Sequence, residues 1–269
     1  MLNIISWNVD GFKTGVVEWL LEYIEKHQPD VFCLNETKCS TVRLKELLGS
    51  VLNGYNLIHN PHTPHQYHGV AVLINKYIVY QEVKIALACR PRSDNRSKDP
   101  CSGRLIAIKL IQYDIVVVAT YNPNAGQLLS KLDYRINQWD PALFSMLQTL
   151  GSENSVIWLG DINVALDDID VSHSKNMAKK AGFSPKERES FQNFLDESGY
   201  VDIWRYQNPS EEVYTWRGYH NPSPYYGMRL DNVLVTPDLL SKYYSIVGLI
   251  LTDCQCNTDH LPVGLKIEE

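Results

Sequence analysis

Residues 156–163 read Val-Ile-Trp-Leu-Gly-Asp-Ile-Asn, and the fold depends on the pattern in this stretch. The apolar run at its start, bounded by turn residues, predicts a short buried strand. Gly160 ends the run, and Asp161 and Asn163 follow at once. Such a strand delivers polar side chains at one end of a sheet. The same pattern occurs at several other places in the chain.

Working outward, other short apolar runs also predict strands. Residues 2–8 lead into Asn8-Val9-Asp10, and residues 31–34 lead into Asn35-Glu36. The remaining predicted strands cover residues 55–59, 70–74, 78–88, 105–111, 115–121, 213–216, 229–236, 246–252 and 261–267.

Helical spacing of apolar residues occurs between these strands. It predicts helices at residues 16–27, 44–48, 128–150 and 185–198. Ser184 is the expected N-cap of the last helix, with Pro185 at its first position. Pro141 lies inside the long pattern at 128–150, so we expect a kink or a division there.

Strands with interspersed helices predict an α/β fold of packed sheets flanked by helices. No linker rich in Gly, Ser or Pro interrupts the chain, so we expect residues 1–269 to form a single domain. A chain of 269 residues can bury a large core without disulfides or structural zinc. The N-terminus lacks the features of a signal peptide, and no apolar run could span a bilayer. These features predict an intracellular protein with reduced cysteines.

The polar groups at the strand ends suggest a chemistry. They are carboxylates, amides, one tyrosine and one histidine, with no cysteine among them: Asn8, Asp10, Glu36, Tyr121, Asp161, Asn163, Asp259 and His260. Such oxygen donors fit a hard divalent cation, and a histidine beside an aspartate can be oriented by it. Together they predict metal-assisted hydrolysis of a phosphoester. Taken alone, a strand-end Asp or Asn is more often a turn residue or a helix cap, Tyr121 an edge-packed aromatic and His260 a turn histidine, so the argument depends on the joint pattern.

The chain resembles the exonuclease III-like apurinic/apyrimidinic (AP) endonucleases of the endonuclease/exonuclease/phosphatase superfamily. The matching segments occur in that family's order over nearly the whole chain. They are residues 5–11, 34–38, 68–71, 103–105, 121–126, 132–135, 139–140, 160–165, 181–183, 187–188, 201–202, 214–216, 229–231 and 258–260. The resemblance implies a four-layer α/β sandwich, in which two packed mixed β-sheets are flanked by helices and the site lies at one end.

The resemblance also implies roles for the polar residues. Glu36 and Asp10 would hold Mg²⁺, for which Mn²⁺ could substitute, and Asn8 and Asp259 would complete its outer coordination. Asp161 would position or deprotonate the attacking water, and Asn163 would orient that water and the phosphate. His260, held by Asp231, would contact the scissile phosphate and stabilise the developing charge. Tyr121 would hydrogen-bond the phosphate or the leaving oxygen. Whether Asp161 or His260 takes the proton stays open.

For DNA binding, the resemblance implies a small apolar pocket for a baseless sugar, lined by Trp216, Met228 and Leu230. Asn124 and Gln127 would lie beside it in the DNA groove. Loops that contact DNA would contain Lys13, Tyr67 and Arg104. The chain departs from the family pattern mainly around the pocket, at Asn35, Arg217, Met228, Asn232 and the loop 217–228.

The implied function is cleavage 5′ to abasic sites in double-stranded DNA, leaving a 3′-hydroxyl and a 5′-deoxyribose phosphate. A 3′→5′ exonuclease or 3′-phosphodiesterase activity could accompany it. The expected protein is a monomer without membrane contact, in a compartment that contains DNA. The alternatives are a broader nuclease or phosphatase of the same superfamily and a catalytically silent DNA-damage-binding module.

The net charge of −6 does not exclude a DNA partner, because five of the acids belong to the implied site. Basic residues are concentrated in two segments. Residues 88–109 hold six basic against two acidic residues, and residues 172–190 hold five against two. If these segments contact phosphates, affinity for DNA should fall steeply with salt.

Overall fold

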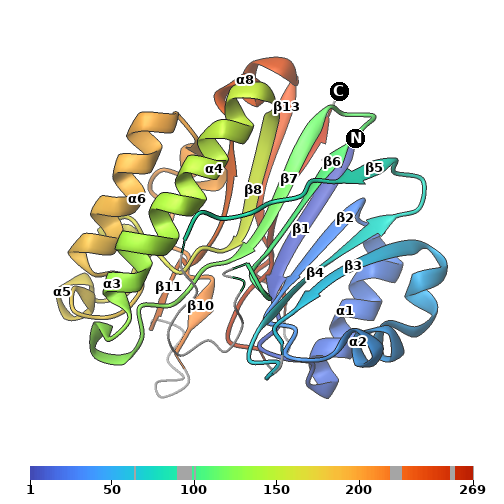
Figure 1. Cartoon of the computed structure of the whole chain (residues 1–269), viewed down its shortest axis with the longest axis horizontal. Helices are drawn as coiled ribbons and strands as arrows, with labels where there is room; N and C mark the ends of the chain where they lie inside the picture. The colour runs from blue at the N-terminus through green and yellow to red at the C-terminus, as the bar shows by residue number, and fades with distance from the viewer. Residues whose placement is uncertain (64, 90–98, 100, 219–225, 255–257, 269) are drawn as a thin grey trace.

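Two six-stranded β-sheets pack face to face, and helices cover their outer faces (Figure 1). This arrangement comes from a computed structural model that describes residues 1–63, 65–89, 99, 101–218, 226–254 and 258–268. Three large apolar clusters fill the spaces between the layers, one between the sheets and one beneath the helices on each side. The expected four-layer α/β sandwich is therefore confirmed.

The first sheet has the strand order β13-β14-β1-β2-β4-β3. Only β1 and β2 run parallel, and the other neighbours are antiparallel. Its outer face is covered by α1 (Thr14–His27) and α2 (Thr41–Leu48), with η1 (Gly49–Asn53) following α2. The strands are β1 (Leu2–Asn8), β2 (Val31–Asn35), β3 (Tyr55–Pro61), β4 (Gly69–Asn75), β13 (Ser245–Ile250) and β14 (Val263–Glu268).

The second sheet has the order β5-β6-β7-β8-β12-β9, with β7 and β8 parallel. Its outer face packs against α4 (Asp140–Glu153) and α6 (Pro185–Ser198). The strands are β5 (Tyr80–Glu82), β6 (Leu105–Leu110), β7 (Ile115–Tyr121), β8 (Ser155–Asp161), β9 (Val201–Asp202) and β12 (Asp231–Val235). The shorter elements are η2 (Gln127–Leu129), α3 (Leu132–Tyr134), η3 (Arg135–Trp139), η4 (Asp168–Asp170), α5 (Ser174–Met177), α7 (Ile203–Gln207), α8 (Pro237–Lys242) and the hairpin β10 (Trp216–Arg217) with β11 (Gly227–Met228).

Strand register brings the predicted polar ends to one edge of the molecule. In the first sheet, Asn8 at the end of β1 pairs with Asn35 at the end of β2. In the second sheet, Asp161 at the end of β8 pairs with Tyr121 on one side and Asp231 on the other. Parallel strands share the direction of their carboxyl ends, so these residues gather at the same edge.

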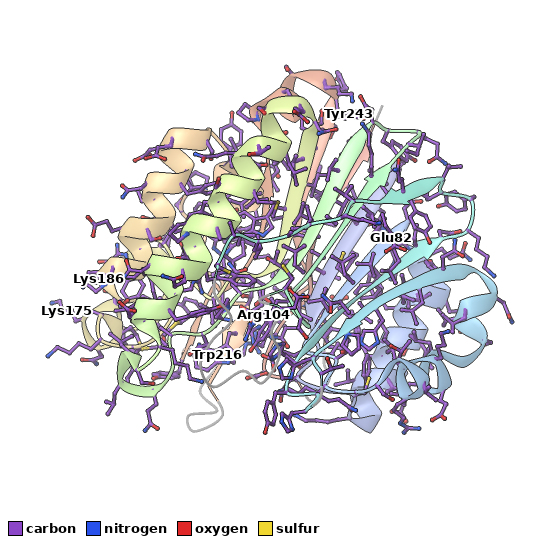
Figure 2. The ribbon with its side chains drawn as sticks, viewed as in Figure 1. Glu82, Arg104, Lys175, Lys186, Trp216 and Tyr243 are labelled. Atoms are coloured by element: carbon purple, nitrogen blue, oxygen red, sulfur yellow. The ribbon has the colours of Figure 1, made fainter. Side chains whose placement is uncertain are left out.

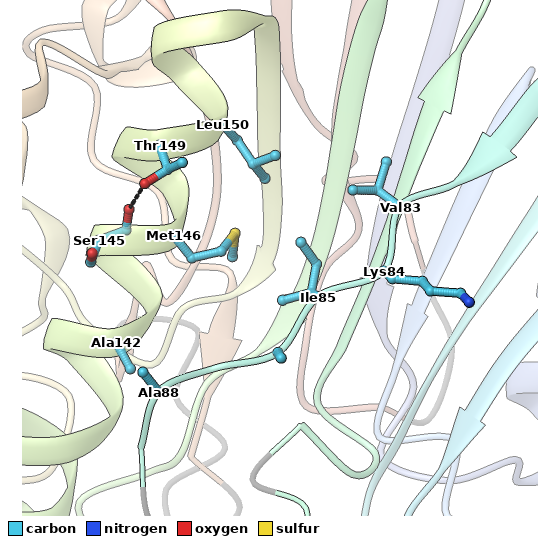
Figure 3. Close-up of a pocket in the computed structure, with 10 residues that line it drawn as sticks. Val83, Lys84, Ile85, Ala88, Ala142, Ser145, Met146, Thr149 and Leu150 are labelled. Atoms are coloured by element: carbon cyan, nitrogen blue, oxygen red, sulfur yellow. Dashed lines mark hydrogen bonds between the residues drawn. The ribbon is translucent and has the colours of Figure 1, made fainter.

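The strand predicted at residues 78–88 is much shorter than expected, because only Tyr80–Glu82 belongs to β5. Residues 83–88 leave the sheet edge and run opposite α4, with Val83 and Ile85 packed against the helix-side cluster. A cavity of about 330 Å³ lies between this segment and Ala142–Leu150 of α4 (Figure 3). Apolar residues at 83–88 therefore face a helix, a role that the sequence pattern does not distinguish from pairing in a sheet.

The helix predicted at residues 128–150 begins later, at Leu132, and contains the π-helical segment η3. Pro141 follows η3 and lies in the first turn of α4, where its missing N–H costs little. The helix continues to Pro141 without a separate loop, because the wider π turn accommodates the proline. A π-helical segment therefore stands where the sequence predicts a kink or a division of the helix. At the next long helix, Ser184 accepts from the backbone N–H of Glu187, which confirms the predicted N-cap of α6.

Within the described part of the chain, no helix combines the length and apolar character that crossing a membrane requires.

Candidate active site

A cavity of about 220 Å³ opens at the edge where the polar strand ends gather. It brings together eleven of the residues predicted from the sequence, from both sheets and the β10–β11 hairpin. The cavity is lined by Asp10, Glu36, Tyr121, Asn124, Asp161, Asn163, Ala181, Trp216, Met228, Leu230, Asp259 and His260.

Local backbone conformation turns several of these side chains inward. Asp10, Glu36 and Asn163 follow strand ends with φ values of 45°, 53° and 56°, in the left-handed region. Gly160 precedes Asp161 with φ 137°, and a Cβ atom there would lie 2.0 Å from the carbonyl oxygen of Thr120. Only glycine permits this close approach of β8 to β7, which explains the glycine in the motif.

Asp10 and Glu36 lie on either side of one lysine that the sequence analysis did not single out. The Lys38 ammonium contacts the Asp10 carboxylate and lies 2.6 Å from Glu36 Oε2. Burial alone would lower the pKa of Lys38, but the two carboxylates reverse this and raise it. Its position two residues after Glu36, in the motif that carries the resemblance, was the available signal. The two carboxylates therefore favour the charged form of Lys38.

Asn8 connects this carboxylate pair with the rest of the site. Its Nδ2 donates to Glu36 Oε1 at 3.2 Å and to Asp161 Oδ2 at 2.9 Å, and its Oδ1 accepts from the backbone N–H of Asp10. The amide oxygen therefore already accepts one hydrogen bond, and the role of Asn8 in the outer coordination of a metal stays a prediction. Through its Nδ2, Asn8 orients carboxylates that belong to two different sheets.

His260 is held by Asp231. The His260 Nδ1 lies 2.7 Å from Asp231 Oδ2, and both residues are buried. Burial would lower the pKa of His260, but the Asp231 carboxylate outweighs it and raises that pKa. Because Nδ1 is occupied, Nε2 is the nitrogen that faces Asp161, 4.0 Å from its Oδ2. The imidazole is thus oriented as the sequence analysis expected.

Asp161 is fixed on several sides. Its Oδ1 accepts from the backbone N–H of Asn163, and its own N–H donates to Asn35 Oδ1 at 3.1 Å, across 126 positions of sequence. Burial first, and then the charge of Asp231, raises the pKa of Asp161. Asn163 is held in turn by its bonds with the Asn122 carbonyl and the Asn124 amide. A carboxylate placed in this way is suited to orient a water molecule or take a proton from it.

Tyr121 contacts the Glu36 carboxylate. Burial raises the pKa of the Tyr121 hydroxyl well above the ordinary value. Arg104 lies beneath it, with its guanidinium carbon 5.2 Å from the Tyr121 ring and Nη1 donating to the Tyr121 carbonyl. Arg104 is only 6% exposed, and its role in a loop that contacts DNA stays a prediction. Stacking and hydrogen bonding draw the guanidinium inward, where it supports Tyr121.

The apolar side of the cavity contains the three predicted pocket residues. Met228 and Leu230 belong to a small cluster with Phe183, and Trp216 packs against it. Trp216 Nε1 donates to Asp259 Oδ2 at 2.9 Å, which joins the apolar side to the acidic side. The structure therefore brings these three residues together at the cavity.

The remaining predicted DNA-contact residues lie outside the cavity lining, apart from Asn124. Lys13 is exposed and forms an ion pair with Asp10 at 2.9 Å. Tyr67 is 66% exposed, with its ring stacked near those of His62 and His65. Gln127 is exposed in η2.

Part of the first basic segment and part of the pocket loop lie outside the described residues, namely 90–98 with 100, and 219–225. Lys175 and Lys186 of the second basic segment lie at the same side of the molecule (Figure 2). Arg104, from the first basic segment, and Trp216 lie near the lower centre in the same view. Arg188 packs over the Phe183 ring and donates to the Leu166 carbonyl. At least one cation of this segment therefore supports the fold.

The donor set fits a divalent cation. Asp259 Oδ1 is buried and has no hydrogen-bond partner among the described residues, although it belongs to a cavity that also contains Asp10 and Glu36. Asp161, Asp231 and His260 form a second group, whose ligand atoms lie within 4.8 Å of one another. Oxygen-rich sites of this kind suit hard cations.

Comparison with known proteins agrees with this geometry. A model of the endonuclease/exonuclease/phosphatase family matches residues 5–253. The chain is similar to the DNA-(apurinic or apyrimidinic site) endonuclease of Dictyostelium discoideum, with 36% identity covering 99% of this chain and 71% of that protein. It is 30% identical to the exodeoxyribonuclease of Bacillus subtilis (strain 168), covering 99% of both chains.

The solved structures agree as well. The AP endonuclease of Leishmania major superimposes with a TM-score of 0.84 at 25% identity, covering 100% of this chain and 88% of that one. Both sheets therefore lie within the matched part of the chain. The chain therefore belongs to the endonuclease/exonuclease/phosphatase family, in the exonuclease III-like branch that contains the AP endonucleases.

Proposed function

We propose that this protein is a Mg²⁺-dependent DNA repair endonuclease. It hydrolyses the phosphodiester 5′ to an abasic site and leaves a 3′-hydroxyl and a 5′-deoxyribose phosphate. The observation that carries the proposal is one cavity that combines His260, Asp161 and a carboxylate pair with an apolar wall, while Asp231 is hydrogen-bonded to His260. The similarity to AP endonucleases over the whole chain supports it.

Asp10 and Glu36 would hold the magnesium ion, with Asp259 contributing from the adjacent segment. A bound divalent cation neutralises negative charge on the phosphate, which favours attack by water. Lys38 is paired with both carboxylates in the metal-free chain, so these contacts would have to loosen for the two side chains to hold the ion.

The chain's own groups divide the remaining tasks. Asp231 fixes the proton on His260 Nδ1, so a second proton on Nε2 can be donated to a phosphate oxygen and stabilise the developing charge. Asp161 orients the attacking water, and Asn8 and Asn163 fix the two oxygens of its carboxylate. Tyr121 would donate a hydrogen bond to the phosphate or the leaving oxygen. The order of proton transfer between Asp161 and His260 stays open.

Substrate selection would depend on the wall formed by Trp216, Met228 and Leu230. A cavity of about 220 Å³ with one apolar side admits a sugar that lacks its base, and a complete nucleotide would meet the apolar cluster behind it. The proposed partner is double-stranded DNA with abasic sites. We also propose that the protein acts as a monomer in an intracellular compartment that contains DNA.

The test uses a duplex with one abasic site and a matched undamaged duplex, each with Mg²⁺ or with EDTA. We expect cleavage only of the abasic duplex and only with Mg²⁺. Glu36→Gln and His260→Ala should each lower the rate at least about 100-fold while the thermal transition is retained. Equal cleavage of both duplexes would refute the preference for abasic sites, and full activity in EDTA would refute the metal requirement.

A second activity at 3′ ends is favoured by the exodeoxyribonuclease relative. The same assay with a recessed 3′ end and a 3′-phosphate end measures it. Release of nucleotides or phosphate at rates near that of abasic cleavage would identify a broader nuclease or phosphatase.

A further inference from the structure

A segment with the side-chain alternation of a strand follows β5 but belongs to neither sheet. From Val83 to Cys89, the odd-numbered side chains pack against the apolar cluster on the outer face of the second sheet. The even-numbered residues between them, Lys84, Ala86 and Ala88, are exposed. Alternation with a period of two residues is the geometry of an extended chain. The segment is therefore a strand in conformation.

One edge of this extended segment is already occupied. The N–H of Val83 donates to the Ala107 carbonyl at 2.9 Å, and the backbone of Leu87 forms a hydrogen bond with the Cys101 thiol. Both bonds come from odd-numbered residues. Backbone groups of successive residues in an extended chain point to opposite edges, so those of residues 84, 86 and 88 point to the other edge.

The other edge is open and faces α4. Residues 84, 86 and 88 line the cavity of about 330 Å³ between the segment and this helix, which we call the α4 groove (Figure 3). Among the residues that the structure describes, none forms a backbone hydrogen bond with the N–H or C=O groups of these three. An unpaired strand edge is a template on which a further extended chain can pair.

The opposite wall of the α4 groove suits apolar side chains. It consists of the residues at positions 142, 145, 146, 149 and 150. Their spacing of three and four residues places them in one stripe along the helix. Met146 and Leu150 are half-buried and point from α4 into the groove (Figure 3). A chain paired with the open edge would therefore bury every second side chain against this stripe.

The charge of the groove favours an acidic occupant. Lys84 is the one charged residue among the described residues that line it. Its side chain is exposed, on the same side of the segment as Ala86 and Ala88. In a paired strand, the side chains beside Lys84 lie on this same exposed face. An Asp or Glu at such a position would complement the lysine.

We propose that the α4 groove binds an extended segment of a partner protein by strand addition. The partner segment pairs with the open edge of residues 84–88, buries alternate apolar side chains against Met146 and Leu150, and places a carboxylate beside Lys84. In this mode, main-chain hydrogen bonds supply affinity and the side-chain sites supply specificity. This binding function goes beyond DNA cleavage, because the α4 groove and the catalytic cavity share no lining residue.

The test uses a fluorescein-labelled peptide, Glu-Val-Thr-Val-Glu, blocked at both ends. Its sequence is the same in both directions, so either orientation brings a glutamate to Lys84 and two valines to the apolar wall. The control is the same peptide with methylated amide nitrogens, which keeps the side chains but removes the main-chain donors. Fluorescence polarisation should show saturable binding of the first peptide alone. No binding of the first peptide, or equal binding of both, would overturn the proposal.

Hydrogen exchange locates the bound peptide on the chain. The amide protons of residues 84, 86 and 88 should exchange at least about tenfold more slowly when the peptide is bound, because they become donors in a ladder. The amide proton of Ile85, which points to the other edge, should show a smaller change. Bound peptide with unchanged exchange at all three positions would overturn strand addition at this edge.

Two serines of α4 give a matched pair of variants. Ser145 lines the groove, and Ser152 is exposed on the same helix outside it. Ser145→Trp should weaken peptide binding at least about tenfold, because the indole occupies the groove, and Ser152→Trp should not. Thermal transitions verify that both variants are folded. Equal affinity of the two folded variants would overturn the proposal.

A charge reversal tests the contact at Lys84 without filling the groove. Lys84→Glu should weaken binding about fivefold, and a peptide with lysine in place of glutamate should restore it. Unchanged affinity of Lys84→Glu for both peptides would overturn the acidic character of the partner. Light scattering covers the remaining occupant. A wild-type dimer that Ser145→Trp dissociates would identify a second copy of this chain in the groove and would overturn the partner segment.

Discussion

At the scale of single residues, the position of Asp161 depends on Asn35 in the other sheet. Asn35 is fully buried, and its Oδ1 accepts from the Asp161 N–H and, at 3.4 Å, from Ser6 Oγ. Asn35 is one of the positions where the chain departs from the family pattern, and its position beside Asp161 became visible only in the folded chain. It connects the two sheets directly below the proposed catalytic carboxylate.

Asn35→Leu keeps the volume but removes the acceptor. We expect it to lower the free energy of unfolding by about 1–3 kcal/mol, because the Asp161 N–H loses its partner in a buried place. The cleavage rate should fall about tenfold with little change in KM, because the carboxylate shifts while the DNA contacts remain. Urea denaturation and steady-state kinetics measure both, with Ser6→Ala as the control. Equal behaviour of the two variants would contradict the assignment.

At the scale of elements, the helical segment from α3 to α4 carries a buried ion pair that holds the catalytic loops. Arg135 Nε lies 2.5 Å from Asp140 Oδ1, and both side chains are 1% exposed. Arg135 also donates to the carbonyl oxygens of Pro123 and Ile162, the residues that precede Asn124 and Asn163 of the cavity lining. The π segment η3 spans Arg135–Trp139, directly before Asp140.

Asp140→Ala should therefore destabilise the protein by about 3 kcal/mol, because it leaves the Arg135 guanidinium buried without its counter-charge. Urea denaturation measures the loss. Asp133→Ala, at an exposed position of α3, is the control and should change stability by less than about 0.5 kcal/mol. A loss as small as that of the control would show that the pair does not stabilise this segment.

A second element-scale contact braces the turn that contains Glu36. His59 on β3 lies between the hydroxyls of Thr37 and Thr41, at 3.0 and 2.9 Å. Burial lowers the pKa of His59 to about 4 from its ordinary value of 6.5. Between pH 6.5 and about 4 the unfolded chain therefore binds more protons at this residue than the folded chain, so stability falls as the pH falls.

The measurement compares melting temperatures of the wild type and His59→Gln between pH 7 and pH 4.5. The wild type should lose more stability than the variant over this interval, because glutamine does not titrate. Parallel pH profiles would show that His59 is not responsible for the acid sensitivity.

At the scale of the whole molecule, acidic groups from both sheets converge on one edge, and their mutual repulsion makes a bound cation stabilising. Mg²⁺ should raise the melting temperature in proportion to the logarithm of its concentration once the site is saturated. Glu36→Gln should reduce this shift, because one ligand loses its charge. Calorimetry of the metal-free protein with and without Mg²⁺ checks this. A shift that is identical in both proteins would place the ion away from Glu36.

The sequence by itself determined the elements that carry the site. Apolar runs ending in Asn8, Glu36 and Asp161 are local patterns, and local patterns report strands and turns. The same reasoning identified the N-cap at Ser184. The same reasoning failed where one apolar pattern fits two structures. Residues 83–88 fit a strand but face a helix, and the predicted helix around Pro141 contains a π segment.

Only the tertiary structure decided how the site residues are paired. Asn8 and Asn35 contact Asp161 over 153 and 126 positions, and Arg104 turns inward beneath Tyr121. Spacing along the chain carries no information about such partners, because two sheets must pack before these side chains meet. The physical reason is that secondary structure follows from neighbouring residues, whereas burial and charge pairing depend on which surfaces the whole chain brings together.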